Sequence, residues 1–235
     1  MGKVLVSIII PVYNEEKTLP EVIKRLLALE LNKELIFIDD GSKDGSSVIL
    51  GSINSSCVKV FRHESNKGKG SAIRTGIKNS SGDIVIIQDA DLEYNPDEIA
   101  GVISPIISDG CDAVFGSRFL KKNPVIYRSF YFGNKLISII ISIIARKKTT
   151  DAYTCYKAFN KKYLENKLLF SSGFEIESEL RMIALTGGAV FKEVPISYSP
   201  RKVAEGKKIK PGDFFTGVLT ALKFFHPRRG RIDSA

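Results

Sequence analysis

The chain has 235 residues, 43% of them hydrophobic, and its 35 basic side chains outnumber 26 acidic ones, which gives a formal net charge of +9. This length allows one large domain or two small ones, and the basic balance indicates an anionic partner: a nucleic acid, a phospholipid surface or a phosphorylated small molecule. The three cysteines are widely spaced and form neither a disulfide framework nor a zinc motif, and no signal peptide is visible, so we expect reduced thiols and a cytoplasmic chain.

Strand-like and helix-like segments alternate through the first half of the chain. Apolar, β-rich runs predict strands at 4–12, 35–38, 58–61, 84–87 and 113–115. Helical spacing of apolar residues predicts helices at 18–31, 46–53, 71–79 and 96–108. This alternation predicts an α/β fold with a doubly wound, mostly parallel sheet and helices on both faces. In such sheets, ligands bind outside the carboxyl ends of the strands.

The character of the chain changes after residue 120. A loop at 121–124 leads to helices expected at 127–145, 175–185 and 214–225, a strand at 190–198 and a charged, mobile segment at 200–210. We expect one domain over 1–235, with halves at 1–120 and 121–225 and a basic, disordered tail at 226–235.

The longest apolar run, 136–145, contains ten residues. A bilayer crossing needs roughly 20, so we do not expect a membrane span. The basic residues 146–148 follow directly. Two readings of the helix at 128–145 therefore stay open: it lies on an anionic membrane surface, or it is a core helix.

Two carboxylates follow the strand at 84–87. Asp89 and Asp91 are separated by Ala90 alone, and residues two apart in an extended chain point to the same side. Hard cations such as Mg²⁺ take one or two carboxylates together with substrate phosphates. The triplet therefore predicts a site for Mg²⁺ or Mn²⁺, and solvated acids in an ordinary turn are the alternative.

Polar groups also follow two other strands. Asp40 follows the strand at 35–38 and offers oxygens to a base N–H or a ribose hydroxyl; a turn and helix N-cap is the alternative. The loop at 11–15 offers Tyr13 as a stacking surface and Glu15 as an acceptor, or is an ordinary loop. Two acidic strand ends in one sheet arise by chance much less often than one acidic strand end.

Basic residues near glycines are candidates for phosphate contacts. The segment 66–70 places Lys69 between two glycines ahead of a helix, as in a phosphate-cradling loop, but it lacks the P-loop spacing. A flexible loop is the alternative. Arginine binds phosphate bidentately and lysine acts as a mobile point charge. The other candidates are Arg118, Arg128, Arg201, Lys207 and Lys208.

Together, these polar segments resemble glycosyltransferase family 2. The segments 11–15, 39–42, 66–70, 89–91 and 116–118 carry the resemblance, and 150–158, 173–179 and 198–208 continue it in order and spacing. Within the family, the chain resembles dolichol-phosphate mannose synthases and related polyprenyl-phosphate glucosyltransferases over about residues 4–210. The resemblance implies a GT-A type nucleotide-diphospho-sugar transferase fold, with the C-terminal helices on the acceptor side.

The resemblance also implies roles for single residues. Asp89 and Asp91 would hold the metal and the diphosphate. Arg118 would bind phosphate near the reaction centre, and Arg201 and Lys207 would close over the diphosphate. The other residues implied to hold the nucleotide sugar are Pro11, Tyr13, Glu15, Ile38, Asp40, Lys69 and Ala90. The acceptor-phosphate site is assigned to Arg118 and to Arg128, which is shifted by one from the family's arginine; Cys155 stands where the subgroup has glycine.

The expected reaction is an inverting, metal-dependent transfer of a hexose, with mannose favoured, from GDP-mannose or UDP-glucose to a polyprenyl (dolichyl-type) phosphate. Asp91 and Arg118 would stabilise the leaving diphosphate. Asp151 is the candidate base or orienter, with a turn and N-cap as its alternative. We expect a peripheral enzyme on the cytoplasmic face of a membrane, and leave a membrane-protein partner open.

Other functions stay open at this point. The chain could use another UDP-sugar or a non-lipid acceptor, or it could bind a nucleotide sugar without turnover. A nucleic-acid-binding module would explain the positive charge and predicts salt-sensitive binding. It gives no reason for acids at three strand ends, so we expect no nucleic acid partner.

Overall fold

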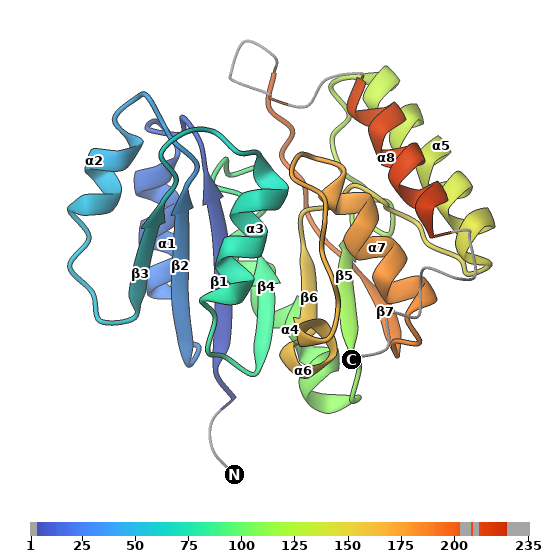
Figure 1. Ribbon diagram of the computed structural model, residues 1–235, viewed down its shortest axis with the longest axis horizontal. Helices are drawn as coiled ribbons and strands as arrows, with labels where there is room; N and C mark the ends of the chain where they lie inside the picture. The colour runs from blue at the N-terminus through green and yellow to red at the C-terminus, as the bar shows by residue number, and fades with distance from the viewer. Residues whose placement is uncertain (1–3, 203–207, 209–211, 225–235) are drawn as a thin grey trace.

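The computed structural model describes residues 4–202, 208 and 212–224. These residues form a seven-stranded sheet in the order β3-β2-β1-β4-β6-β5-β7, with helices on both faces (Figure 1). Every strand pair is parallel except those of β6, which runs antiparallel to β4 and β5. The prediction of a doubly wound, mostly parallel α/β sheet is confirmed. The strands are β1 (Val6–Val12), β2 (Lys33–Asp39), β3 (Val58–Arg62), β4 (Ile84–Ile87), β5 (Ala113–Ser117), β6 (Lys157–Asn160) and β7 (Phe191–Pro195).

The middle strand of the first half is apolar along almost its whole length. Ile8 of β1 pairs with Leu35 of β2 on one side and with Ile86 of β4 on the other, and all three are fully buried. A strand covered by helices on both faces needs apolar residues at every position, so it shows a continuous run instead of alternation.

Helices cover both faces of this sheet. Figure 1 shows α3 (Lys69–Lys78) and α7 (Ile176–Thr186) in front of it, and α1 (Leu19–Ala28) and α4 (Ile99–Ser108) behind. Gly76 lets α3 pack closely on β1, because a Cβ there would lie 2.3 Å from Ile9 Cγ2. The remaining helical segments are α2 (Ser46–Gly51), the 3₁₀ turn η1 (Pro96–Glu98), α5 (Arg128–Ala145), α6 (Lys161–Glu165) and α8 (Gly212–Lys223).

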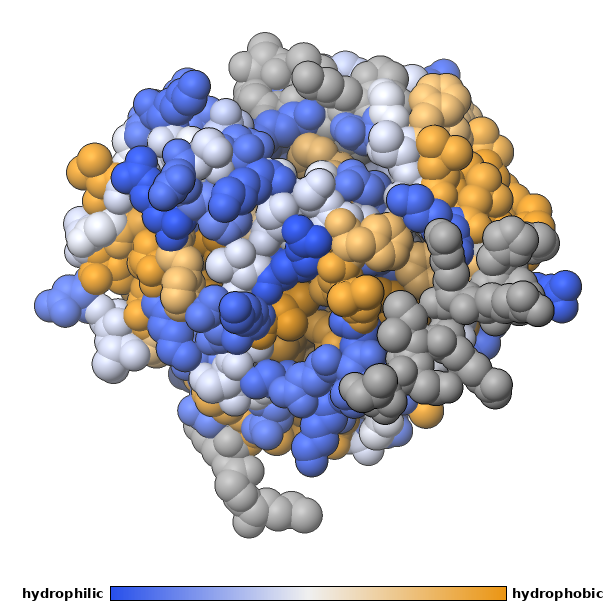
Figure 2. All heavy atoms as spheres, viewed as in Figure 1, coloured by the Kyte–Doolittle hydropathy of each residue, from blue (hydrophilic) through white to orange (hydrophobic). Residues whose placement is uncertain are grey.

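The helices α5 and α8 lie side by side next to α7 (Figure 1). Their inner faces pack around Ile137, Ile141 and Ala221, which join Met182 and Leu185 of α7 in a separate apolar cluster. Their outer faces are solvent-exposed, and Figure 2 shows hydrophobic surface over these two helices. The large exposed apolar residues of these two helices are Phe132, Leu136, Ile139, Ile143, Phe215, Leu219 and Leu222.

One helix in the described residues, α5, is long and apolar enough to cross a membrane, judged by length and composition alone. The same test is passed by helices of soluble proteins. Only 17% of the 18 residues of this helix are buried inside the protein. Because its inner face packs on α7 and α8, the helix is neither a wholly buried core helix nor separate from the protein body.

The structure differs from the sequence expectation around residues 157–198. Neither β6 nor α6 was predicted, and the strand expected at 190–198 is reduced to β7. The four residues of β6 begin with Lys157, which is fully buried, so neither length nor hydropathy marks a central strand. The predicted tail at 226–235 and Lys207 lie outside the described residues.

Candidate functional site

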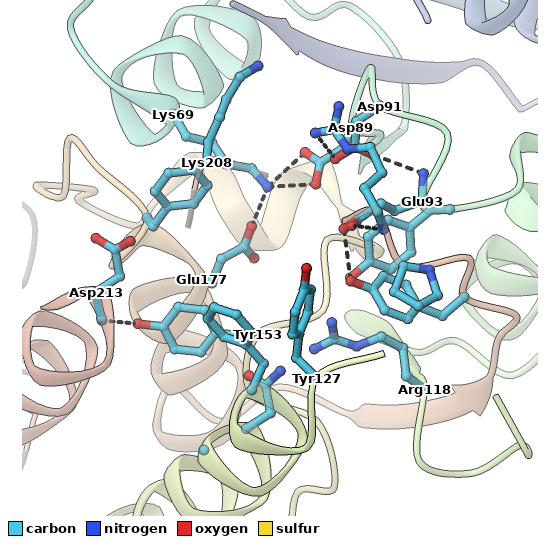
Figure 3. A pocket seen from close by; sticks show the side chains of 18 of the residues that line it. Lys69, Asp89, Asp91, Glu93, Arg118, Tyr127, Tyr153, Glu177, Lys208 and Asp213 are labelled. Carbon is cyan, nitrogen blue, oxygen red and sulfur yellow. Dashed lines mark hydrogen bonds and ion pairs between the residues drawn. The ribbon is translucent and has the colours of Figure 1, made fainter. Parts of the chain in front are cut away.

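A cleft of about 1400 Å³ lies at the carboxyl ends of the strands. Charged groups line it, and Figure 3 shows Lys69, Asp89, Asp91 and Arg118 among them. Apolar and aromatic side chains from the segment after β5 and from α5 also line it: Phe119, Val125, Ile126, Phe130, Tyr131 and Leu136. One cavity therefore offers both a charged and an apolar lining. Of the residues predicted to bind the nucleotide sugar, it brings together Pro11, Tyr13, Glu15, Asp40, Lys69, Asp89, Ala90, Asp91, Arg118 and Arg201.

Asp89 and Asp91 follow β4 and both line the cleft. Asp89 accepts a hydrogen bond from Lys69 Nζ, which lies 2.7 Å from Oδ1 and 3.0 Å from Oδ2. Asp91 Oδ2 lies 3.0 Å from a terminal nitrogen of Arg201. Burial, together with the nearby charges of Asp89 and Glu93, raises the pKa of Asp91 to about 7. Burial and carboxylate repulsion at Asp91 thus outweigh the positive charge of Arg201.

Lys69 is the first residue of α3 and is shared between two acids. Its Nζ lies 2.7 Å from Asp89 Oδ1 and 2.8 Å from Glu177 Oε1 (Figure 3). Burial alone would lower the pKa of Lys69, but the charges of Asp89 and Glu177 hold it well above its usual value. Lys69 is therefore a fixed positive charge beside the acid pair.

Asp40 lines the cleft in a fixed orientation. Its carboxylate accepts hydrogen bonds from the backbone N–H groups of Lys67 at 2.9 Å and Gly68 at 2.8 Å, and Oδ1 lies 2.7 Å from His63 Nδ1. Gly68 has φ +92°, and a Cβ there would lie 2.4 Å from Ser172 O, so the loop requires glycine. The predicted loop at 66–70 is thus hydrogen-bonded to Asp40, the acid predicted to bind a base or a ribose hydroxyl.

Glu15 anchors the segment that follows Tyr198. Its carboxylate accepts hydrogen bonds from Arg201 at 2.9 and 3.2 Å. Lys208 donates to Glu15 and to the backbone oxygen of Tyr13. Arg201 also reaches Asp91, so the positive charges of this segment already lie on the acidic side of the cleft.

Arg118 follows β5 and is held by a buried acid. Its Nε and one terminal nitrogen each donate to Asp151 at 2.7 Å, and its backbone N–H donates to the same carboxylate at 2.9 Å. Burial alone would raise the pKa of Asp151, but Arg118 lowers it. The guanidinium stacks over Tyr198, 4.9 Å from the ring centroid. Asp151 is fully buried and does not line the cleft, which favours its role as orienter over that of a base.

The structure does not bring every predicted site residue to the cleft. The Ile38 side chain is fully buried against Ile9 and Ala72 on the face covered by α3, because alternate strand residues point to opposite faces. Arg128 is exposed at the start of α5 and does not line the cleft, although its neighbours Tyr127 and Ser129 do. The side chains of Ile38 and Arg128 therefore do not join the other predicted site residues in the cleft.

Sequence reasoning gave no role to two residues that line the cleft from the second half of the chain. Glu177 comes from the first turn of α7, and Tyr153 donates a hydrogen bond from its hydroxyl to Asp213 O at 2.7 Å (Figure 3). An acid in the first turn of a helix is expected from the helix dipole alone. The only sequence signal was that the segments 150–158 and 173–179 contributed to the family resemblance.

The acidic residues fit a divalent cation that also binds substrate. Among the described residues, no group of three or more His, Cys, Asp or Glu side chains forms a metal site by itself. Asp89 and Asp91 supply the one or two carboxylates that Mg²⁺ uses when phosphates complete its coordination. The raised pKa of Asp91 is consistent with a position that gains from added positive charge.

Comparisons with known proteins agree on one family. The profile of the family described as "Glycosyl transferase family 2" matches residues 7–167. A UDP-N-acetylglucosamine–dolichyl-phosphate N-acetylglucosaminyltransferase of Methanococcus voltae is 33% identical over 96% of this chain and 95% of its own length. A dolichol-phosphate mannosyltransferase of Pyrococcus furiosus is 36% identical over 86% of this chain and 58% of its own length.

The fold is shared with a solved glycosyltransferase structure. Glucosyl-3-phosphoglycerate synthase from Mycobacterium tuberculosis, crystallised with Mn²⁺, UDP and glucosyl-3-phosphoglycerate, superposes with a TM-score of 0.73 over 95% of this chain and 80% of that one. The sequence identity is 19%, so the likeness concerns the fold alone.

Proposed function

Since the chain belongs to glycosyltransferase family 2 and is a glycosyltransferase with a GT-A fold, we propose that it transfers a hexose from a nucleotide diphosphate sugar to a polyprenyl phosphate. The observation that carries the proposal is that one cleft is lined both by charged groups and by a set of apolar and aromatic side chains. A diphosphate and an acceptor phosphate need the former, and a polyprenyl chain needs the latter. The names of two relatives, which include dolichyl phosphate, support the acceptor class.

The donor would bind with its nucleoside near Tyr13 and Asp40 and its diphosphate near Asp89 and Asp91. A Mg²⁺ or Mn²⁺ ion held by these two acids would supply Lewis-acid charge to the leaving diphosphate. Lys69 and Arg201 already lie against the same acids and would add fixed positive charge where negative charge grows. Lys207, the other residue proposed to close over the diphosphate, lies outside the described residues.

The acceptor phosphate would bind beside Arg118. Its oxygen attacks the anomeric carbon directly while the bond to the diphosphate breaks, which inverts the configuration. This oxygen is already anionic, so the step requires no strong base. Asp151 would act by holding the Arg118 guanidinium in place through its two hydrogen bonds at 2.7 Å.

The outer faces of α5 and α8 would lie on the membrane from which the lipid comes. Ile143 is 70% exposed on α5 and Phe215 is 68% exposed on α8, and such an apolar surface suits a lipid interface. The exposed basic residues 146–148 follow α5 and would attract an anionic leaflet. We propose peripheral attachment on the cytoplasmic face, which leaves the α5 inner face packed against α7 and α8.

The sugar is the open part of this proposal. Mannose is the sequence-based preference, whereas the full-length similarity to an enzyme named for UDP-N-acetylglucosamine favours N-acetylglucosamine. The test is turnover of GDP-mannose, UDP-N-acetylglucosamine and UDP-glucose with a short polyprenyl phosphate and Mn²⁺ in detergent. We expect one donor to give a lipid-linked sugar. No lipid product with any donor, or transfer only to soluble acceptors, would contradict the proposal.

A further inference from the structure

A row of four alternating charges runs from the cleft into the protein core. Asp89 pairs with Lys69, Lys69 with Glu177, and Glu177 with Lys157. The four side chains come from four different places: the end of β4, the start of α3, the first turn of α7 and the start of β6. The row thus joins the acid pair of the donor site to the second half of the chain.

Glu177 is the central acid of this row, and each of its oxygens lies within ion-pair distance of a lysine, although Oε1 has no hydrogen bond of good geometry. Oε1 lies 2.8 Å from Lys69 Nζ, and Oε2 accepts a hydrogen bond from Lys157. The residue is 2% exposed, and Lys157 is fully buried. A buried carboxylate between two ammonium groups holds both of them, because either would otherwise lose a charged partner in a poorly solvated place.

Lys69 needs such a holder because of its chemistry. A lysine side chain is a point charge on a flexible stem, and its other partner, Asp89, is a carboxylate that the proposed divalent cation would also use. Without Glu177, the ammonium would depend on Asp89 alone and would compete with that cation. With Glu177, Lys69 keeps a charged partner when Asp89 is engaged, and it stays within the cleft.

We propose that Glu177 is a positioning residue that holds the Lys69 ammonium at the donor diphosphate and leaves Asp89 available to the divalent cation. This role rests on the proposed function, because it assumes a nucleotide diphosphate at Asp89 and Asp91. The other acid of the pair shows the same arrangement, since Arg201 bridges Asp91 and Glu15. In each case a basic residue on one acid of the pair has a second acid as its anchor.

A purely structural role predicts a different outcome from a positioning role. If Glu177 only neutralises Lys157, the double variant Glu177→Gln/Lys157→Met removes the buried charge together with its partner and restores both stability and ligand binding. If Glu177 positions Lys69, the double variant regains stability but still binds the diphosphate weakly. The second replacement therefore separates the folding effect from the site effect.

The experiment measures binding of UDP and of GDP by calorimetry, with and without Mn²⁺, and the free energy of unfolding in urea. Variants are Glu177→Gln, the double variant, and Glu34→Gln as a matched control. Glu34 is also a buried acid paired with a lysine, Lys59 at 2.6 Å, but it does not line the cleft. We expect about 10–100-fold weaker Mn²⁺-dependent binding in both Glu177 variants and unchanged binding in the control.

Two results would overturn the inference: full affinity in Glu177→Gln, or restoration of affinity in the double variant. Failure of the proposed function is a separate result, because it appears in the unmodified protein. In that case the unmodified protein binds neither UDP nor GDP in the presence of Mn²⁺, even at nucleotide concentrations that would saturate a nucleotide-sugar enzyme.

Discussion

Replacing Asp151 by asparagine should release Arg118 while leaving the shape of the site unchanged. Asp151 is fully buried and accepts three N–H groups of Arg118. Asparagine removes the charge and turns an amide N–H₂ toward the guanidinium, so at least one of the 2.7 Å bonds is lost. The buried arginine then lacks a counter-charge.

The size of the effect follows from this burial. Removing one partner of a buried ion pair costs about 3–5 kcal/mol, a large part of the 5–15 kcal/mol typical of a folded domain. The loss should be seen in urea unfolding at neutral pH. For turnover, a misplaced Arg118 should lower kcat/KM about 100-fold, as removal of a preorganised charge does elsewhere.

The pH profile separates an orienter from a base. If Asp151 orients Arg118, Asp151→Asn lowers kcat/KM by a similar factor at every pH, and adding Arg118→Lys costs little more. If Asp151 is a base, the acidic limb of the profile disappears and Arg118→Lys adds its full loss. The control is Asp109→Asn, which removes a half-exposed ion pair with Lys192 and should change neither quantity. Unchanged stability and turnover in Asp151→Asn would refute the reasoning.

Three further predictions concern stability, metal dependence and membrane binding. Burial alone would raise the pKa of Glu34, but hydrogen bonds from Lys59 and from serines that contact it lower the pKa to about 2. Glu34→Gln should therefore reduce the free energy of unfolding by about 3 kcal/mol. Solvent screening at the partly exposed Lys59 lowers this expected loss to about 2 kcal/mol. Since the folded pKa lies below the usual 4.5, this stabilisation is complete above pH 4.5 and fades as the pH falls toward 2. Asp91→Ala should reduce Mn²⁺-dependent turnover about 100-fold or more in a lipid-product assay. The double variant Ile143→Asp/Phe215→Asp should bind anionic vesicles more weakly in a sedimentation assay, with unchanged turnover in detergent.

Each of these predictions has an outcome that contradicts it. For Glu34, a stability difference that is undiminished at pH 2.5 would show that charge is not its source. For Asp91, full turnover would remove it from the metal site. For α5 and α8, unchanged vesicle partitioning would show that another surface contacts lipid, whereas loss of the folded state would be detected by circular dichroism before the vesicle assay.

The sequence predicted most of the first half of the fold because its strands are apolar runs between glycine-bearing and polar loops. The position of the acids followed from the same pattern, since the carboxyl ends of parallel strands meet at one edge. Asp40, Asp89 and Arg118 accordingly lie in one cleft. Local periodicity was enough here, because each element is defined by its own residues.

The second half depends on contacts between distant residues. Lys157 can begin a central strand only because Glu177 supplies its counter-charge, and the two are twenty positions apart. Asp151 is buried only because Arg118, thirty-three positions earlier, binds it. No window of neighbouring residues contains this information, so β6 was missed and Asp151 was left between two roles. Ile38 lies away from the cleft for a simpler reason, since strand alternation turns its side chain toward α3.

The antiparallel strand β6 also sets the distance between the ends of β4 and β5. It lies between β4, which leads to Asp91, and β5, which leads to Arg118. Neighbouring strands are about 4.8 Å apart, so the two strand ends are separated by about 10 Å across the sheet. That separation is fixed by backbone hydrogen bonds and is insensitive to side-chain replacement. Substitutions on either side can change what is bound, but the backbone keeps the distance between the two strand ends that carry Asp91 and Arg118.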